Sequence, residues 1–145
     1  MTAPADPSLA ARALDLARAA LARRGAPPEP PSRLLVVDVE RQRAVLIENG
    51  AAKAAWPVSS ARAGVGGAEG SYRTPPGWHR VHRRIGDGAE EGSVFVSREP
   101  TGEMWRGEAR DDDLILTRIL TLDGLEEGVN RGPGHDSLER YVYLH

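Results

Sequence analysis

The aromatic and imidazole side chains at the end of the chain are the residues best suited to chemistry. The sequence closes on Tyr-Val-Tyr-Leu-His, residues 141–145. If this segment is a β-strand, its alternation places Tyr141, Tyr143 and His145 on one face and the apolar Val and Leu between them on the other. Phenols beside an imidazole could form the wall of a polar, substrate-binding pocket. The same pattern also fits an exposed aromatic face on a sheet.

Other chemistry is poorly supported by the residue types and their spacing. The chain contains no cysteine, so its residues supply no disulfide, thiolate metal site or cysteine nucleophile. His79 and His82 are separated by three positions in a predicted strand, so they face opposite sides and cannot hold one metal ion together. His135 lies in a loop where a local hydrogen bond is expected. The aspartate run at residues 111–113 is typical of a solvated loop, and we expect no metal and no cofactor.

The glycine-rich segment at residues 63–71 could in principle cradle a phosphate with its backbone amides. Its spacing matches neither phosphate-binding glycine motif, and it lies between predicted strands instead of leading from a strand into a helix. We therefore expect a flexible loop. The chain also lacks the Gly-x-Ser-x-Gly motif of serine hydrolases.

The elements that must position these residues are mainly β. Short runs rich in branched apolar residues at 34–39 and 43–48 flank a polar turn and predict a hairpin. Further strands are predicted at residues 53–59, 78–85, 93–97, 114–122 and 140–144. Turn residues separate nearly all of them, so the body of the chain is expected to be a β domain.

The N-terminal part has a different pattern. Residues 8–24 are rich in Ala, Leu and Arg and predict one amphipathic helix, whose mainly alanine apolar face suits packing on its own domain or on a partner better than a membrane surface. The predicted organisation is therefore a helix at residues 1–25, a proline-rich linker at 26–33 and a β domain at 34–145.

The length and net charge of the chain limit the number of domains and the kinds of partner that it can have. The 145 residues suffice for one compact domain. The net charge of −2 argues against nucleic acid as a partner. No apolar run is long enough to predict a transmembrane segment. The N-terminus shows no secretory signal, which predicts a cytoplasmic location if Met1 is the true start.

The order of several motifs resembles the YkuD-type L,D-transpeptidase catalytic domain. The first hairpin leads to Asn49-Gly50, and a Pro-Val-Ser strand is followed by the glycine loop and then by Thr-Pro-Pro-Gly at residues 74–77. The segment Leu-Ile-Leu-Thr-Arg-Ile-Leu that begins at Leu114, followed by Tyr-Val-Tyr-Leu-His, is similar to the family strand that ends in His-Gly-Thr. The resemblance covers residues 34–145.

The resemblance implies a YkuD-like β-sandwich and an acyl transfer on peptidoglycan stem peptides, outside the cytoplasmic membrane. In the family a cysteine thiolate attacks the carbonyl before the terminal D-alanine, and an amine from a neighbouring stem resolves the thioester. No cofactor is implied. His145 corresponds to the upstream histidine that helps shape the substrate site.

The family's Ser-His-Gly-Cys motif, with the catalytic histidine and the nucleophile, has no counterpart in residues 1–145. The sequence therefore predicts a β-sandwich that is incomplete at its C-terminus and a chain that is inactive as given. A transpeptidase truncated before this motif is one hypothesis. A non-catalytic module that binds peptidoglycan, or an interaction protein that uses its N-terminal helix, are the others.

Overall fold

The computed structural model describes residues 6–145, which form one helix followed by short strands. The elements are α1 (Pro7–Ala20), β1 (Arg33–Asp38), β2 (Arg43–Glu48), β3 (Ala51–Pro57), β4 (His79–Ile85), β5 (Ser93–Val96), β6 (Glu99–Met104), β7 (Ile115–Leu116), β8 (Ile119–Gly124) and β9 (Tyr143–Leu144). The predicted mainly β class is confirmed.

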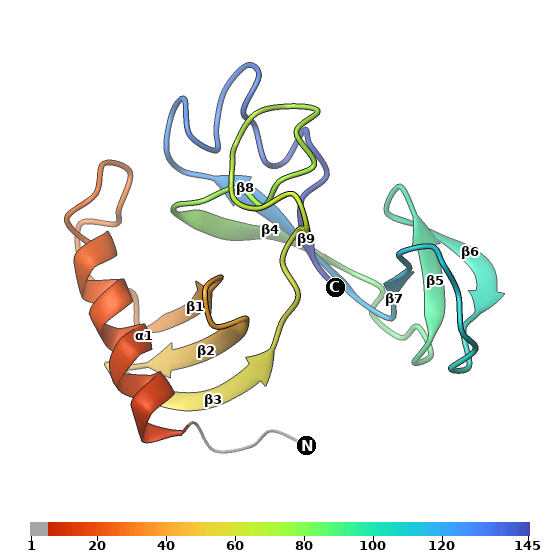
Figure 1. Cartoon of the computed structure of the whole chain (residues 1–145), viewed down its shortest axis with the longest axis horizontal. Coiled ribbons are helices and arrows are strands. Elements are labelled where there is room, and N and C mark those ends of the chain that lie inside the picture. Colours follow the sequence, from red (N-terminus) through yellow and green to blue (C-terminus); the bar gives the residue numbers. More distant parts are fainter. Residues whose placement is uncertain (1–5) are drawn as a thin grey trace.

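The strands form three antiparallel sheets in the described part of the chain, with orders β1-β2-β3, β4-β8-β9 and β6-β5-β7. Figure 1 shows α1 against the sheet of β1 to β3, the strands β4 and β8 at the centre, and the sheet of β5 to β7 on the far side. The long loops gather beside β4 and β8 (Figure 1). The C-terminal strand β9 lies at an edge of the central sheet.

The N-terminal helix begins and ends for local reasons. The Asp6 carboxylate accepts the backbone N–H of Ser8 at 2.7 Å, and Pro7 takes the first helical position, where its missing N–H has no cost. The helix ends at Ala20, earlier than the predicted residue 24. A 3₁₀-type turn follows the helix, because the N–H of Ala22 bonds to the carbonyl of Ala19, three residues earlier.

The helix packs on its own domain, as the alanine-rich face predicts. Ala13 of α1 is 1% exposed and forms a core with Val45 and Ile47 of β2, which are equally well buried. A methyl side chain at residue 13 lets the helix approach the sheet closely. The packing makes α1 and the first sheet one layered unit.

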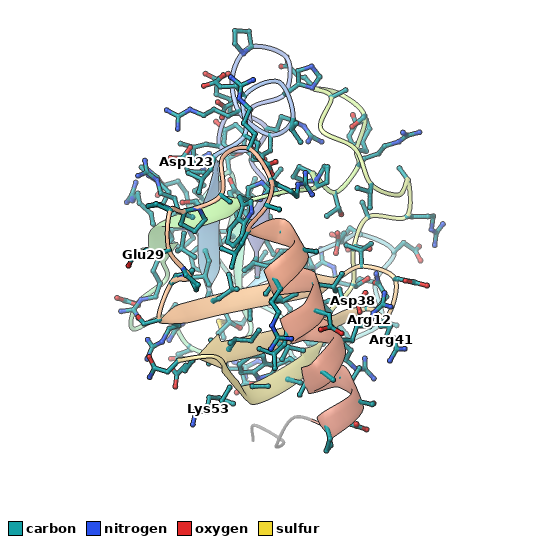
Figure 2. The ribbon with its side chains drawn as sticks, turned by 90° about the vertical axis from the view of Figure 1, so that its left-hand side faces the viewer. Arg12, Glu29, Asp38, Arg41, Lys53 and Asp123 are labelled. Atoms are coloured by element: carbon teal, nitrogen blue, oxygen red, sulfur yellow. The ribbon has the colours of Figure 1, made fainter. Side chains whose placement is uncertain are left out.

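A charged contact adds to this packing at the margin of the helix. The Arg12 guanidinium bonds to the carboxylates of Asp38 at the end of β1 and of Glu40 in the following turn. Figure 2 shows Arg12 and Asp38 lying together where the helix passes the end of β1. The hydrogen bond from Arg12 lowers the pKa of the buried Asp38 carboxyl.

The single strand predicted at residues 114–122 is wrong in detail, because the chain changes sheets inside it. β7 pairs with β5, whereas β8 pairs with β4 and β9. The break falls at Thr117, which has a φ of 67°. Strand β6 was not predicted, since Pro100 and Gly102 interrupt its pattern and pairing with β5 supplies the order instead.

The predicted strand at residues 140–144 is also shorter than expected. Residues 137–141 form turns, and Tyr141 has a φ of 59°, so only Tyr143 and Leu144 pair with β8. The Asp136 carboxylate accepts the backbone N–H groups of Leu138 and Glu139 at 3.0 and 3.2 Å and so stabilises the turn. A simple alternation over residues 141–145 therefore does not describe this segment.

Replacing Val45 with alanine tests the core between helix and sheet. Because Val45 is 2% exposed, the loss of its methyl groups should lower the free energy of unfolding by about 2 kcal/mol. The matched control is Val96→Ala, at a position 62% exposed, which should cost about 0.5 kcal/mol or less. Urea denaturation of both variants measures the difference, and equal losses would contradict the assigned core.

Candidate functional site

The side chains of Tyr141 and Tyr143 lie together even though only Tyr143 belongs to a strand. Their ring centroids are 6.3 Å apart, and the rings meet edge to face at 83°. Arg98 joins them. Its guanidinium carbon lies 4.2 Å from the centre of the Tyr141 ring and 5.7 Å from that of Tyr143, within the range of cation–π attraction.

Arg98 also fixes the C-terminal segment through hydrogen bonds. Its Nε donates to the Tyr143 hydroxyl at 2.9 Å, and its Nη2 donates to the carbonyl of Leu138 at 2.8 Å. Together these contacts hold the turn and the strand that follow residue 137 against the β5–β6 hairpin. We call Arg98, Tyr141 and Tyr143 the Arg–Tyr cluster.

The hairpin turn that carries Arg98 has an unusual residue choice. Ser97 and Arg98 connect β5 to β6 with φ values of 49° and 72°, so both residues occupy the left-handed region. Two-residue hairpin turns of this kind favour asparagine and glycine, because other side chains are strained there. The sequence keeps an arginine at a position where its backbone is disfavoured.

An open groove of about 670 Å³ lies next to this cluster. Its lining comes from the end of β4, the loop that follows it and the β5–β6 hairpin. The lining includes four charged side chains, Arg83, Asp87, Arg98 and Glu99, and the ring of Tyr141 from the C-terminal segment. The groove lining therefore mixes polar and apolar groups, with both signs of charge and two aromatic rings, those of Phe95 and Tyr141.

The predicted site residues are thus partly brought together. Tyr141 lines the groove, and Tyr143 supports it through Arg98. His145 is exposed directly after β9 and is not part of the groove lining. Sequence reasoning missed Arg98, because no spacing or motif links an arginine in a hairpin turn to tyrosines more than 40 residues later.

A buried polar junction connects the Thr-Pro-Pro-Gly segment to the loop after β8. The Glu126 carboxylate, whose side chain is 6% exposed, accepts the backbone N–H of Trp78 at 2.6 Å. The Asn130 amide donates to the carbonyls of Pro76 and Trp78, both at 2.9 Å. Gly77 has a φ of 92°, and a Cβ there would lie 1.9 Å from a Glu126 oxygen, so only glycine fits.

The same junction includes the end of the N-terminal helix. The Trp78 indole donates to the carbonyl of Ala20 at 2.8 Å, and Arg23 bonds to Glu126 at 3.1 Å. Trp78 itself is 8% exposed. The buried carboxylate is therefore satisfied by two groups that are distant in sequence, the backbone N–H of Trp78 and the guanidinium of Arg23.

His79 extends the junction toward the C-terminal segment. Its Nδ1 donates to the carbonyl of Gly77 at 3.1 Å, and its Nε2 then accepts the Ser137 hydroxyl at 2.8 Å. Burial lowers the pKa of this imidazole, and the Gly77 carbonyl and the charges of Glu126 and Asp123 oppose the shift. His82 lies exposed at the bulge of β4, apart from His79.

The glycine-rich segment is a loop, and part of it is tied to the residues around it. Val65 pairs with Thr74, and the N–H of Glu69 bonds to the carbonyl of Gly134 at 2.8 Å. Arg140 donates to the carbonyls of Gly67 and Arg73 at 3.2 and 2.9 Å. These bonds bring the loop next to the segment that precedes the tyrosines.

Comparison with known families matches residues 32–145 to the YkuD L,D-transpeptidase catalytic domain. The chain belongs to this family. Neither a search of curated proteins nor one of solved structures found a significant match. The YkuD match includes every residue of the groove and of the buried junction except Ala20 and Arg23, which lie in and just after α1.

Two further observations concern residues 6–145 of this YkuD chain. No group of three or more His, Cys, Asp or Glu side chains in that range is arranged to hold a metal ion. No helix in that range is long and apolar enough to cross a membrane.

Substitution of Gly77 by alanine tests the junction. The new methyl group would collide with the Glu126 carboxylate, so the variant should lose at least about 3 kcal/mol of unfolding free energy. Gly88→Ala is the matched control, since Gly88 has a φ of 79° but open space around it and should lose only about 1 kcal/mol from backbone strain. Similar losses for the two variants would show that Glu126 does not occupy this position.

The pH dependence of stability tests the burial of His79. Its pKa is lower in the folded chain than the ordinary value of 6.5, so the unfolded chain binds the proton more readily. Stability should therefore be full above about pH 6.5 and should fall as the pH drops below it, before the carboxylates titrate.

The comparison is between His79→Gln and the exposed control His82→Gln, with thermal unfolding measured between pH 7 and 5. His79→Gln should flatten the slope in this interval. His82→Gln should leave it unchanged. A slope that survives in His79→Gln would assign the proton to another group.

Proposed function

We propose that this YkuD domain recognises peptidoglycan stem peptides in the groove beside the Arg–Tyr cluster. The observation that carries the proposal is the family match over residues 32–145. The groove supports it, because an aromatic ring and charged side chains of both signs suit a peptide that carries carboxylates and an amine. In this proposal Tyr141 faces the peptide in the groove and Tyr143 acts by holding Arg98, whereas His145, outside the groove lining, is a proposed substrate contact beyond the groove.

The chemistry of the family sets a limit on what these residues do alone. Acyl transfer through a thioester needs a thiolate nucleophile, and residues 1–145 contain no cysteine. The part of the reaction that we propose for this chain is therefore binding and orientation of the stem peptide. Its proposed setting is cell-wall remodelling outside the cytoplasmic membrane.

Calorimetric titration with a soluble stem tetrapeptide tests the proposal. The unaltered chain should bind the tetrapeptide and release no D-alanine from it. Tyr141→Ala should weaken binding about tenfold, equivalent to about 1.4 kcal/mol, because Tyr141 supplies the aromatic wall of the groove. Tyr72→Ala is the control, since Tyr72 is 87% exposed and is not part of the groove lining.

Failure to bind the tetrapeptide would refute recognition of stem peptides by this chain. Equal weakening by Tyr141→Ala and Tyr72→Ala would place any binding elsewhere on the surface. Release of D-alanine by the unaltered chain would contradict the limit drawn from the lack of cysteine.

A further inference from the structure

The hydrogen-bonding capacity of Arg98 is only partly used within the chain. A guanidinium carries N–H groups along two edges, and each edge can bind a planar acceptor with two parallel hydrogen bonds. Tyr143 and Leu138 occupy Nε and one N–H of Nη2, which lie on the same edge. The other edge, made of Nη1 and the second N–H of Nη2, has no hydrogen-bond partner among residues 6–145.

This edge belongs to a side chain that is held in place. The guanidinium lies 4.2 Å from the centre of the Tyr141 ring and is fixed by its two hydrogen bonds, so little side-chain freedom remains to be lost on binding a ligand. Arg98 is half-buried and lines the groove. A fixed, partly desolvated guanidinium binds an anion better than a mobile surface arginine.

The charged side chains that line the groove favour binding of an anion at Arg98, except on the side of Glu99. Arg83 also lines the groove, and its side chain forms no ion pair within residues 6–145. Asp87 forms an exposed ion pair with Arg84 at 2.9 Å, which reduces its repulsion of an anion. Glu99, next to Arg98 in the sequence, is the carboxylate of the lining that would repel an anion.

Backbone strain points to the same residue. Ser97 and Arg98 both take left-handed conformations that cost free energy and that an Asn-Gly turn would relieve. Strain of this kind persists only where the surrounding structure holds it, and it is concentrated at ligand-binding and active sites. The contacts to Tyr143 and Leu138 account for one edge of the guanidinium and leave the other for a ligand.

We propose that the free edge of Arg98 is a carboxylate-binding site, which takes a carboxylate of the bound peptide in two parallel hydrogen bonds while Tyr141 covers the face of the guanidinium. The source of the carboxylate, a stem peptide, rests on the proposed function. The arrangement of the donor groups follows from Arg98 alone. This site makes Arg98 the residue that sets the orientation of the peptide in the groove.

The test compares an acetylated dialanine that has a free C-terminal carboxylate with the same peptide as its C-terminal amide. Titration monitored by NMR should detect binding of the carboxylate form and at least a tenfold weaker interaction with the amide. Arg98→Lys should remove this preference, because an ammonium offers no fork of parallel donors. The control Arg33→Lys changes an exposed arginine paired with Glu48 and should leave binding unaltered.

Arg98→Lys also removes contacts to the C-terminal segment, so a second variant keeps the test independent of folding. Glu99→Gln removes the repelling charge without touching Arg98 and should tighten binding of the carboxylate about threefold at low salt, with no change for the amide. Equal affinity for carboxylate and amide would overturn the site, as would a Glu99→Gln variant that binds the carboxylate no better.

The outcomes separate this inference from the proposed function. If the stem tetrapeptide binds but is indifferent to Arg98→Lys and Glu99→Gln, stem-peptide recognition stands and the Arg98 site is wrong. If the dialanine carboxylate binds with the predicted preference while the tetrapeptide does not bind, the Arg98 site stands and its natural ligand is a different carboxylate.

Discussion

The carboxylate of Glu126, buried away from water, is the constraint on which the arrangement of this chain depends. A buried charge is costly unless hydrogen bonds replace its hydration, and here the replacements come from the backbone of Trp78 and from Arg23. The Asn130 amide donates to the carbonyls of Pro76 and Trp78 in the same turn. The junction therefore joins the end of α1, the Thr-Pro-Pro-Gly-Trp segment and the loop after β8.

Backbone hydrogen bonds connect this junction to the segment that lines the groove. The N–H of Ser137 bonds to the carbonyl of Asn130 at 2.9 Å, and the N–H of Val142 bonds to the carbonyl of Ser137 at 3.1 Å. The segment that carries the tyrosines is thus anchored at Ser137 to the buried junction and at Tyr143 to Arg98. Within residues 6–145 no buried side-chain nitrogen or oxygen lacks a hydrogen-bond partner, so this anchoring carries no unsatisfied polar group.

Local patterns predicted the elements of the fold better than the site. The alanine face of the helix and the branched apolar runs of the first hairpin depend on nearby residues, and both predictions are confirmed. The strand predicted at residues 114–122 is wrong because the chain pairs with two different sheets, which no local pattern encodes, and bends at Thr117.

The site depends on contacts between residues that are distant in sequence. Tyr141 and Tyr143 do lie together, as predicted, but the cause is their shared contact with Arg98 and not a continuous strand. The partners of Glu126 lie 48 and 103 residues away, beyond the reach of any spacing argument.

The proposed binding site places the peptide against Arg98 and Tyr141 and not elsewhere on the domain. Mapping of NMR chemical shifts during titration of the unaltered chain with the stem tetrapeptide tests it most directly. We expect the signals of the Arg98 Nε–H and of the backbone amides of residues 97–99 and 138–143 to shift together with one dissociation constant. Shifts confined to α1 and the sheet of β1 to β3, with the Arg98 Nε–H unchanged at saturation, would contradict it.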